Sequence, residues 1–158
     1  MIEDDVGCDR SERGQRFVAC LASMPAGVPV IHVDSGSTDG NVERARAAGV
    51  TVVELPTLTG FTAARARNAG WRTLLSQWPD LRYVRFIDGG CILEPDWIAA
   101  GVNALENQPN LAVAFGRLTE PHPEARLYNA QCDREWNVLV GEVCACGGTA
   151  DIHQIGAW

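Results

Sequence analysis

The chain has 158 residues, of which 46% are hydrophobic and 21% charged, and its formal net charge at pH 7 is −7. This length allows one domain with a sizeable core and is short for two. The negative charge argues against a protein that chiefly binds nucleic acid or an anionic membrane. No apolar run approaches the roughly 20 residues of a spanning helix, and the acidic start MIEDD is unlike a signal peptide, so we expect a cytoplasmic protein without a transmembrane segment.

Helical and extended patterns alternate along the chain. In chain order, the predicted elements are a helix over 12–24, a strand over 28–34, a helix over 41–49, a strand over 51–55, a helix over 61–78, a strand over 81–88, a helix over 95–107, a strand over 111–118 and a helix over 123–140. Helical spacing of apolar residues indicates the helices, and β-branched runs between Gly and Pro indicate the strands. This alternation predicts parallel βαβ units, hence an α/β fold with a mostly parallel sheet and helices on both faces.

The six cysteines do not form the framework of a disulfide scaffold, because they are too sparse at this length. Cys20 lies in the apolar run FVACLASM, which is typical of a small core residue on a helix. Cys144 and Cys146 form C-A-C, one residue short of the C-x-x-C spacing of zinc and redox sites. We therefore expect free thiols.

Two aspartates end predicted strands, Asp34 after VPVIHV and Asp88 after LRYVRFI. In open α/β sheets, ligands bind beyond the carboxyl ends of the strands. The placement of these two carboxylates therefore predicts a binding site before any family is considered.

The loop DSGSTDG has two interpretations. Asp34 and Ser35 can hydrogen-bond a base or a ribose, while the glycines let a ligand approach the backbone. The same residue types also suit a tight turn and a helix N-cap at Ser37, Thr38 or Asp39. Both interpretations stay open from the sequence.

The predicted helix TAARARNAGW contains two residues, Arg67 and Asn68, whose presence helix formation alone does not explain. Arg67 precedes Trp71 by four residues and therefore lies on the apolar side, where a charge needs a partner. Guanidinium groups suit phosphate, so phosphate binding and a purely structural role both stay open for Arg67. Asn68 gains nothing from helix propensity. Arg65, by contrast, is at a position expected to be solvated.

The segment FIDGGC places Asp88 at the rim of a rigid strand, next to Gly89 and Gly90. A carboxylate there can bind a cation or a sugar hydroxyl, and the glycines would allow a ligand to come close. The alternative is a turn that needs glycine for a positive φ. The tail contains Glu142 and the pair Gly147–Gly148, for which a plain loop is favoured over a cleft lining.

Four segments in this order, VIHVDSGSTDG, FTAARARNAGW, YVRFIDGGCILEPDWI and CGG, resemble family 2 glycosyltransferases of the GT-A type. The resemblance spans roughly residues 14–150. It implies a Rossmann-like GT-A nucleotide-binding half, in a single domain over 1–158 without the usual C-terminal acceptor part. It further implies transfer of a sugar from a nucleotide-diphosphate sugar to an acceptor hydroxyl, in inverting fashion, with Mg²⁺ or Mn²⁺.

The resemblance also implies a role for each matching residue. Asp34 and Ser35 match the strand end that holds the base and ribose. Arg67 and Asn68 match the helix that approaches the nucleotide. Asp88 matches the first aspartate of the Asp-x-Asp metal motif and is the residue expected to bind the metal. Gly147 and Gly148, similarly, match a glycine pair near the acceptor cleft.

The sequence departs from the family pattern in several places. Gly90 replaces the second metal carboxylate, and Ser35 stands where many members have a second acidic residue. The downstream acidic residue that serves as catalytic base has no evident counterpart before Trp158, so no catalytic residue is assigned. The N-terminal segment MIEDDVGCDRSER is polar, unlike the apolar first strand of family members. We expect a missing first strand, an exposed sheet edge and a homodimer that covers it.

Three functions are compatible with these observations. The first is an enzyme that transfers a sugar. The second is a non-catalytic nucleotide-binding remnant, or an interaction module, with the same fold. The third is another α/β protein, such as a nucleotidyltransferase, that shares the sheet by analogy. Position 90 and the missing base discriminate between the first two.

Overall fold

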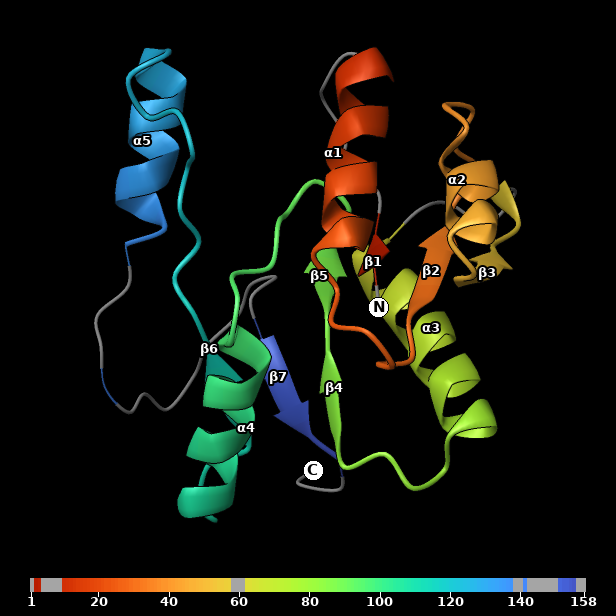
Figure 1. Cartoon of the computed structure of the whole chain (residues 1–158), viewed down its shortest axis with the longest axis vertical. Helices are drawn as coiled ribbons and strands as arrows, with labels where there is room; N and C mark the ends of the chain where they lie inside the picture. The colour runs from red at the N-terminus through yellow and green to blue at the C-terminus, as the bar shows by residue number, and fades with distance from the viewer. Residues whose placement is uncertain (1, 4–9, 58–61, 138–140, 142–150, 156–158) are drawn as a thin grey trace.

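The computed structural model describes residues 2–3, 10–57, 62–137, 141 and 151–155. In chain order, the elements are β1 (Ile2–Glu3), α1 (Arg10–Ala22), β2 (Ile31–Asp34), α2 (Asn41–Ala47), β3 (Thr51–Glu54), α3 (Ala63–Gln77), β4 (Tyr83–Arg85), β5 (Ile87–Asp88), α4 (Trp97–Asn107), β6 (Val113–Phe115), α5 (Leu127–Glu135) and β7 (Asp151–Gln154). The strands form two sheets, one parallel and one antiparallel (Figure 1).

The parallel sheet has the strand order β3-β2-β1-β5 and is covered by helices on both faces, as predicted. All four residues of β2 are buried. Ile31 and Val33 pack in one core cluster with residues of α3. His32 faces the other way and stacks against Phe17 of α1, with 4.8 Å between ring centroids. A strand buried on both faces is typical of a parallel sheet.

The prediction of a mostly parallel sheet is wrong for the second half of the chain. β4, β7 and β6 form an antiparallel sheet in that order. The strand predicted over 81–88 is divided at Phe86 between the two sheets, since β5 pairs with β1 and β4 pairs with β7. The tail contributes β7, where no strand was predicted. β7 lies between β4 and β6, so β6 does not extend the parallel sheet.

The prediction of a missing first strand is also wrong. Ile2 pairs in parallel with His32 on one side and with Ile87 on the other, so β1 occupies an interior place in the sheet. Two residues are too few for a sequence pattern to predict, and the pairing depends on the two neighbouring strands. The expected sheet edge at this place is therefore not exposed. The homodimer, which rested on that edge, stays a prediction.

The helix α4 packs against the antiparallel sheet through Gly101. A Cβ atom at this position would lie 2.6 Å from Cδ1 of Ile152 on β7 and 3.8 Å from Cβ of Ala114 on β6. Ile152 is itself 2% exposed. The absence of a side chain at Gly101 thus allows the close approach of helix and sheet.

We expect Gly101→Val to lower the free energy of unfolding by about 1–3 kcal/mol, because the added methyl groups overpack this contact. The matched control is Ala100→Val, which introduces the same side chain at an exposed position of the same helix. Denaturant titration of both variants measures the difference. Helix propensity alone would not destabilise Gly101→Val, since valine is the better helix former of the two residues, so an unchanged or higher stability of this variant would contradict the close contact with β7.

The helices agree with their predicted ranges to within a few residues, except α5. A helix was predicted over 123–140, whereas α5 runs from Leu127 to Glu135. Arg126 precedes it with an extended backbone, φ −151°. Within the described ranges, no helix is both long and apolar enough to cross a membrane.

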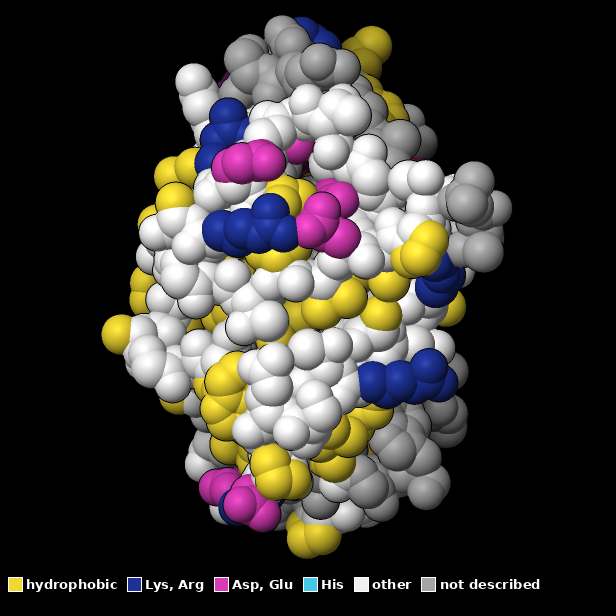
Figure 2. Space-filling view, turned by 90° about the vertical axis from the view of Figure 1, so that its right-hand side faces the viewer, with side chains coloured by type: hydrophobic (Ala, Val, Ile, Leu, Met, Phe, Trp, Pro, Cys, Tyr) yellow, Lys and Arg dark blue, Asp and Glu magenta, His cyan; other side chains and the backbone are white. Residues whose placement is uncertain are grey.

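The face formed by α2, β3 and α3 has a mixed surface. Figure 2 shows an interrupted band of hydrophobic side chains there, with acidic and basic side chains in contact above it. Arg46 of α2 and Glu54 of β3 form an exposed ion pair. An exposed pair of this kind adds little stability.

Candidate functional site

Asp34, at the carboxyl end of β2, is held by its own loop. Its side chain is 3% exposed, and its two carboxylate oxygens accept hydrogen bonds from the backbone amides of Gly36 at 2.9 Å and Ser37 at 3.1 Å. Burial by itself raises the pKa of Asp34, but the hydrogen bonds from Ser37 and Gly36 outweigh it and hold the pKa below the ordinary value of 3.8. Asp34 is therefore ionised at neutral pH.

The rest of this loop depends on glycine. Gly36 has φ +101°, and a Cβ atom there would lie 2.4 Å from Cγ2 of Thr57. The N-cap of α2 is Gly40, with φ 84°, so the predicted cap at Ser37, Thr38 or Asp39 is wrong. Asp39 instead accepts a hydrogen bond from the amide of Asn41 at 3.1 Å. The loop thus contains the tight turn without the predicted cap, and Ser35 is half-buried beside Asp34.

We expect the stability provided by the Asp34 carboxylate to depend on pH. Because the pKa is lower in the folded state, this stability is fully present above about pH 4 and is lost as the pH falls through the folded pKa. Asp34→Asn replaces the charged carboxylate acceptors by a neutral amide oxygen. It should lower the free energy of unfolding by about 1 kcal/mol at pH 7. Asp80→Asn, at an exposed position, is the control. Urea titrations of both variants at pH 7 and pH 3 should show a difference that shrinks in acid for Asp34→Asn alone.

Asp88 lies at the carboxyl end of β5, in register with Glu3 of β1. The amide of Cys91 donates to the carbonyl of Asp88 at 3.0 Å and closes the turn. The positive φ values among the described glycines do not include Gly89 or Gly90. The backbone of this turn therefore does not require glycine for φ, contrary to the turn interpretation, and the Asp88 side chain is half-buried beside it.

A buried thiol also fixes the Asp88 turn from the side of α1. Sγ of Cys20 lies 3.8 Å from the carbonyl oxygen of Asp88. Burial, with a contribution from Cys91, raises the pKa of Cys20 to about 12, so the thiol keeps its proton and can donate it. The prediction that Cys20 is a free thiol in the core is confirmed, since it is 0% exposed.

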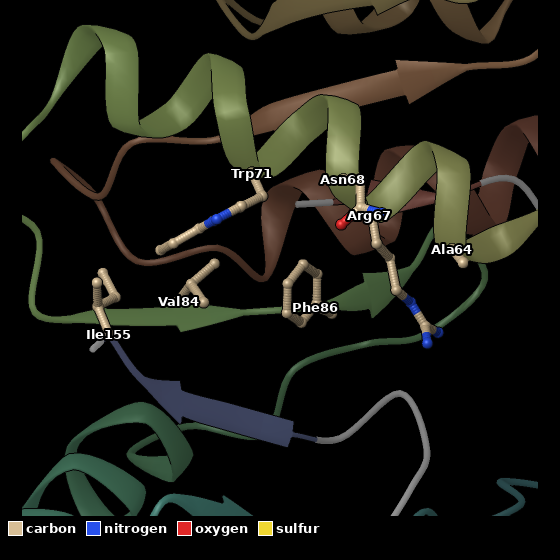
Figure 3. Close-up of a pocket in the computed structure, with 7 residues that line it drawn as sticks. All are labelled: Ala64, Arg67, Asn68, Trp71, Val84, Phe86 and Ile155. Atoms are coloured by element: carbon tan, nitrogen blue, oxygen red, sulfur yellow. The ribbon is translucent and has the colours of Figure 1, made fainter. Parts of the chain in front are cut away.

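Arg67 and Asn68 lie on the second turn of α3. The helix begins after Thr62, whose hydroxyl accepts a hydrogen bond from the amide of Arg65 at 3.2 Å. Arg67 is half-buried, and its guanidinium lies 6.0 Å from the ring centroid of Phe86. Figure 3 shows the Arg67 side chain extending past Phe86, away from Trp71. The predicted position of Arg67 on the apolar side of the helix is confirmed.

A pocket of about 370 Å³ lies between α3 and β4. Its lining consists of Ala64, Arg67, Asn68, Trp71, Val84, Phe86 and Ile155 (Figure 3). Arg67 and Asn68 were predicted as site residues, whereas the apolar lining was not. The sequence indicated part of the apolar lining, because the spacing of four residues places Trp71 on the same side of the helix as Arg67.

The topology brings Asp34 and Asp88 to the same edge of the parallel sheet. β1 lies between β2 and β5, and all three strands run in the same direction. α3 packs on the cluster that contains Ile31 and Val33 of β2. Gly147 and Gly148 lie outside the described residues.

The chemical capacity of this edge is that of an anion and polyol site. It offers an ionised carboxylate in a fixed loop, a second, half-buried carboxylate at a turn, and a guanidinium on a nearby helix. Among the described residues, no group of three or more His, Cys, Asp or Glu side chains is placed to hold a metal ion.

The family model described as glycosyl transferase family 2 matches residues 14–142, which is most of the chain. The chain therefore belongs to glycosyltransferase family 2, and the resemblance found in the sequence is confirmed. A search of curated proteins gave no match. The chain thus carries a glycosyltransferase-like domain, in which the sequence segments around Asp34, Arg67 and Asp88 fall within the matched residues.

Proposed function

We propose that this protein binds a nucleotide-diphosphate sugar at the carboxyl edge of the parallel sheet. The observation that carries the proposal is the position of Asp34 and Asp88 at one sheet edge, on either side of β1, within a family 2 domain. Ligands of open α/β sheets bind at this edge.

Asp34 and Ser35 bind the nucleoside part of the ligand in this proposal. The Asp34 carboxylate keeps the loop in one conformation, because its oxygens accept the amides of Gly36 and Ser37. An ionised carboxylate has about four acceptor sites, so capacity remains for a ribose hydroxyl or a base N–H. The half-buried hydroxyl of Ser35 lies next to it in the chain.

Arg67 and Asn68 bind the diphosphate. A guanidinium donates two parallel hydrogen bonds to phosphate oxygens, which a lysine could not do in the same fixed geometry. The half-buried position of Arg67 over Phe86 limits the conformations of the side chain and reduces the entropy lost on binding. Asn68 is exposed and lines the same pocket, where its amide can donate to the ligand.

Asp88 is the residue that would hold Mg²⁺ or Mn²⁺ together with the diphosphate. Such ions are often bound by one or two protein carboxylates plus substrate phosphates and water. Asp88 fits this role with one carboxylate, while Gly90 supplies no ligand side chain. When bound, the cation neutralises charge on the diphosphate leaving group.

The proposed reaction is transfer of the sugar to an acceptor hydroxyl. The alternative is a domain that binds the nucleotide without turnover, and Gly90 is the observation that favours it. If about 4 kcal/mol of transition-state stabilisation is lost with a weakly held metal, the rate falls on the order of a thousandfold. Gly90→Asp separates the two functions, because restored transfer would mean that the rest of the site is complete.

A thermal-shift panel tests the binding proposal. UDP, GDP, dTDP and their sugars are added to the protein with and without Mn²⁺. A ligand at about 100 times its Kd stabilises the native state by roughly 2.7 kcal/mol. For a domain of this size, that corresponds to a rise in Tm on the order of 5–10 °C. A cooperative melt that none of these ligands shifts, with or without Mn²⁺, would refute nucleotide binding.

A further inference from the structure

Two cysteines meet at the turn that follows β5. Cys20 lies on α1 and is 0% exposed, whereas Cys91 ends the turn and is half-buried. The carbonyl oxygen of Asp88 lies 3.8 Å from Sγ of Cys20 and 3.0 Å from the amide nitrogen of Cys91. One oxygen atom thus contacts the thiol of the first cysteine and the backbone of the second.

A second contact holds the same segment against α1. The hydroxyl of Ser23 accepts a hydrogen bond from the amide of Leu93 at 2.9 Å. Ser23 follows Cys20 by three residues, so both lie on one side of the helix. Cys91 stands between Asp88 and Leu93 in the chain, and both of these residues contact α1. The structure therefore holds Cys91 beside the part of α1 that carries Cys20.

The two thiols share one apolar environment. Cys20 is a buried member of the core cluster between α1 and β5, and Cys91 is a partly buried residue packed against that cluster. Burial raises the pKa of Cys20 most, and the thiol of Cys91 raises it further. Because a Coulombic effect falls with distance, this influence places the two thiols near each other. Both cysteines are reduced in this structure.

The turn between the two cysteines has unused conformational freedom. Gly89 and Gly90 separate Asp88 from Cys91, and neither glycine is among the described residues with a positive φ. The present backbone thus does not use the freedom that a residue without a side chain provides. This freedom allows the turn to move when the two sulfur atoms approach to the roughly 2.05 Å of a disulfide bond.

We propose that Cys20 and Cys91 form a reversible disulfide that displaces the Asp88 turn. The oxidant is hydrogen peroxide, which reaches the half-buried Cys91 and not the buried Cys20. The thiol of Cys91 takes one oxygen atom from the peroxide and becomes a sulfenic acid, and water is released. The thiol of Cys20 then attacks this sulfur. The S–S bond forms, and the sulfenic oxygen leaves with the proton of Cys20 as a second water molecule.

The disulfide removes a contact that holds Asp88 in place. A disulfide sulfur carries no proton, so Cys20 no longer donates to the Asp88 carbonyl. Displacement of the turn then moves the Asp88 carboxylate at the edge of the parallel sheet, which makes the disulfide a redox switch of the candidate site. Only this effect on ligand binding rests on the proposed function, whereas the disulfide itself does not.

Peptide mapping tests for the disulfide. The protein is treated with hydrogen peroxide, its remaining thiols are alkylated, and it is digested with trypsin without reduction. Trypsin releases Cys20 in residues 17–44 and Cys91 in residues 86–117, and neither peptide contains another cysteine. We expect mass spectrometry to find these two peptides joined, and to find them separate after treatment with dithiothreitol. Oxidised protein that yields no joined pair would overturn the proposal.

Amide hydrogen exchange measures the displacement of the turn. The amides at positions 91 and 93 donate to the Asp88 carbonyl and to the Ser23 hydroxyl. In the oxidised protein they should exchange about tenfold faster, as expected when one hydrogen bond is lost. The same peroxide treatment should leave both amides of Cys91→Ser unchanged. A joined pair of peptides without faster exchange would contradict the displacement.

Nucleotide binding measures the consequence for the candidate site. Peroxide should weaken the Mn²⁺-dependent binding of the nucleotide by at least about tenfold, and dithiothreitol should restore it. Cys132→Ala, which removes a buried thiol on α5, should respond like the unchanged protein, whereas Cys91→Ser should not respond. An equal response of Cys91→Ser would overturn the switch. If the reduced protein binds no nucleotide, the proposed function fails, and mapping and exchange still decide the disulfide.

Discussion

Phe17→Ala is expected to lower the free energy of unfolding by about 3–5 kcal/mol. Phe17 is 1% exposed and packs in the core cluster that joins α1 to Ile87 of β5. Its ring also stacks on His32 of β2, with a centroid distance of 4.8 Å. The substitution removes apolar contacts on the α1 face of the parallel sheet and leaves a cavity there. Denaturant titration by circular dichroism measures the loss.

Val18→Ala is the matched control for this experiment. Val18 is adjacent in the same helix but is 51% exposed, so its truncation should change the stability by no more than about 0.5 kcal/mol. A loss below about 1 kcal/mol for Phe17→Ala would mean that α1 does not pack on the sheet. The result matters for function, because α1 also supports the Asp88 turn through Cys20.

Arg67→Gln is expected to weaken the binding of the nucleotide diphosphate by about 10- to 100-fold, because a hydrogen bond to a charged group contributes about 1.5–3 kcal/mol. Glutamine retains a donor at this position and removes the charge. Isothermal titration calorimetry with the nucleotide that gives the largest thermal shift measures the change. Arg67→Lys should recover only part of the affinity, since lysine keeps the charge without the planar pair of donors.

Arg72→Gln is the control for a general effect of charge. Arg72 lies on the same helix at an exposed position outside the pocket lining. Its substitution should change the affinity by less than about threefold, because exposed charges are screened by salt. Equal weakening by both variants would contradict a specific role of Arg67. The melting temperature of each free variant shows whether the fold is retained.

Local patterns in the sequence determined the helices and their buried faces. Phe17 and Cys20 lie three residues apart on one side of α1, and both are buried as the helical spacing predicts. Arg67 and Trp71 lie four residues apart on α3, and both line the pocket. The four consecutive residues of β2 are buried because a parallel strand is covered on both faces. The family was also evident from the sequence, in segments that the family match includes.

The tertiary structure alone decided that β1 and β7 are strands, and it alone decided how the strands pair. β1 has two residues, and β7 lies in a tail that resembles a loop, so neither contains a period long enough to identify. Each is a strand because neighbouring strands pair with it on both sides. The strand predicted over 81–88 is divided at Phe86 for the same reason. β7 pairs with its first half, β4, and β1 pairs with its second half, β5.

The details of the candidate site likewise depended on distant contacts. The sequence predicted Asp34 and Asp88 at strand ends, and β1 between them places both at one edge. Gly36 is required at its position by its positive φ and by the proximity of Thr57. Gly89 and Gly90 are not required by φ. Only the folded backbone shows this difference. Residue types and periodicity are local properties and fix the helices. Strand partners and the space between them are set by the packing of segments that are far apart in the chain.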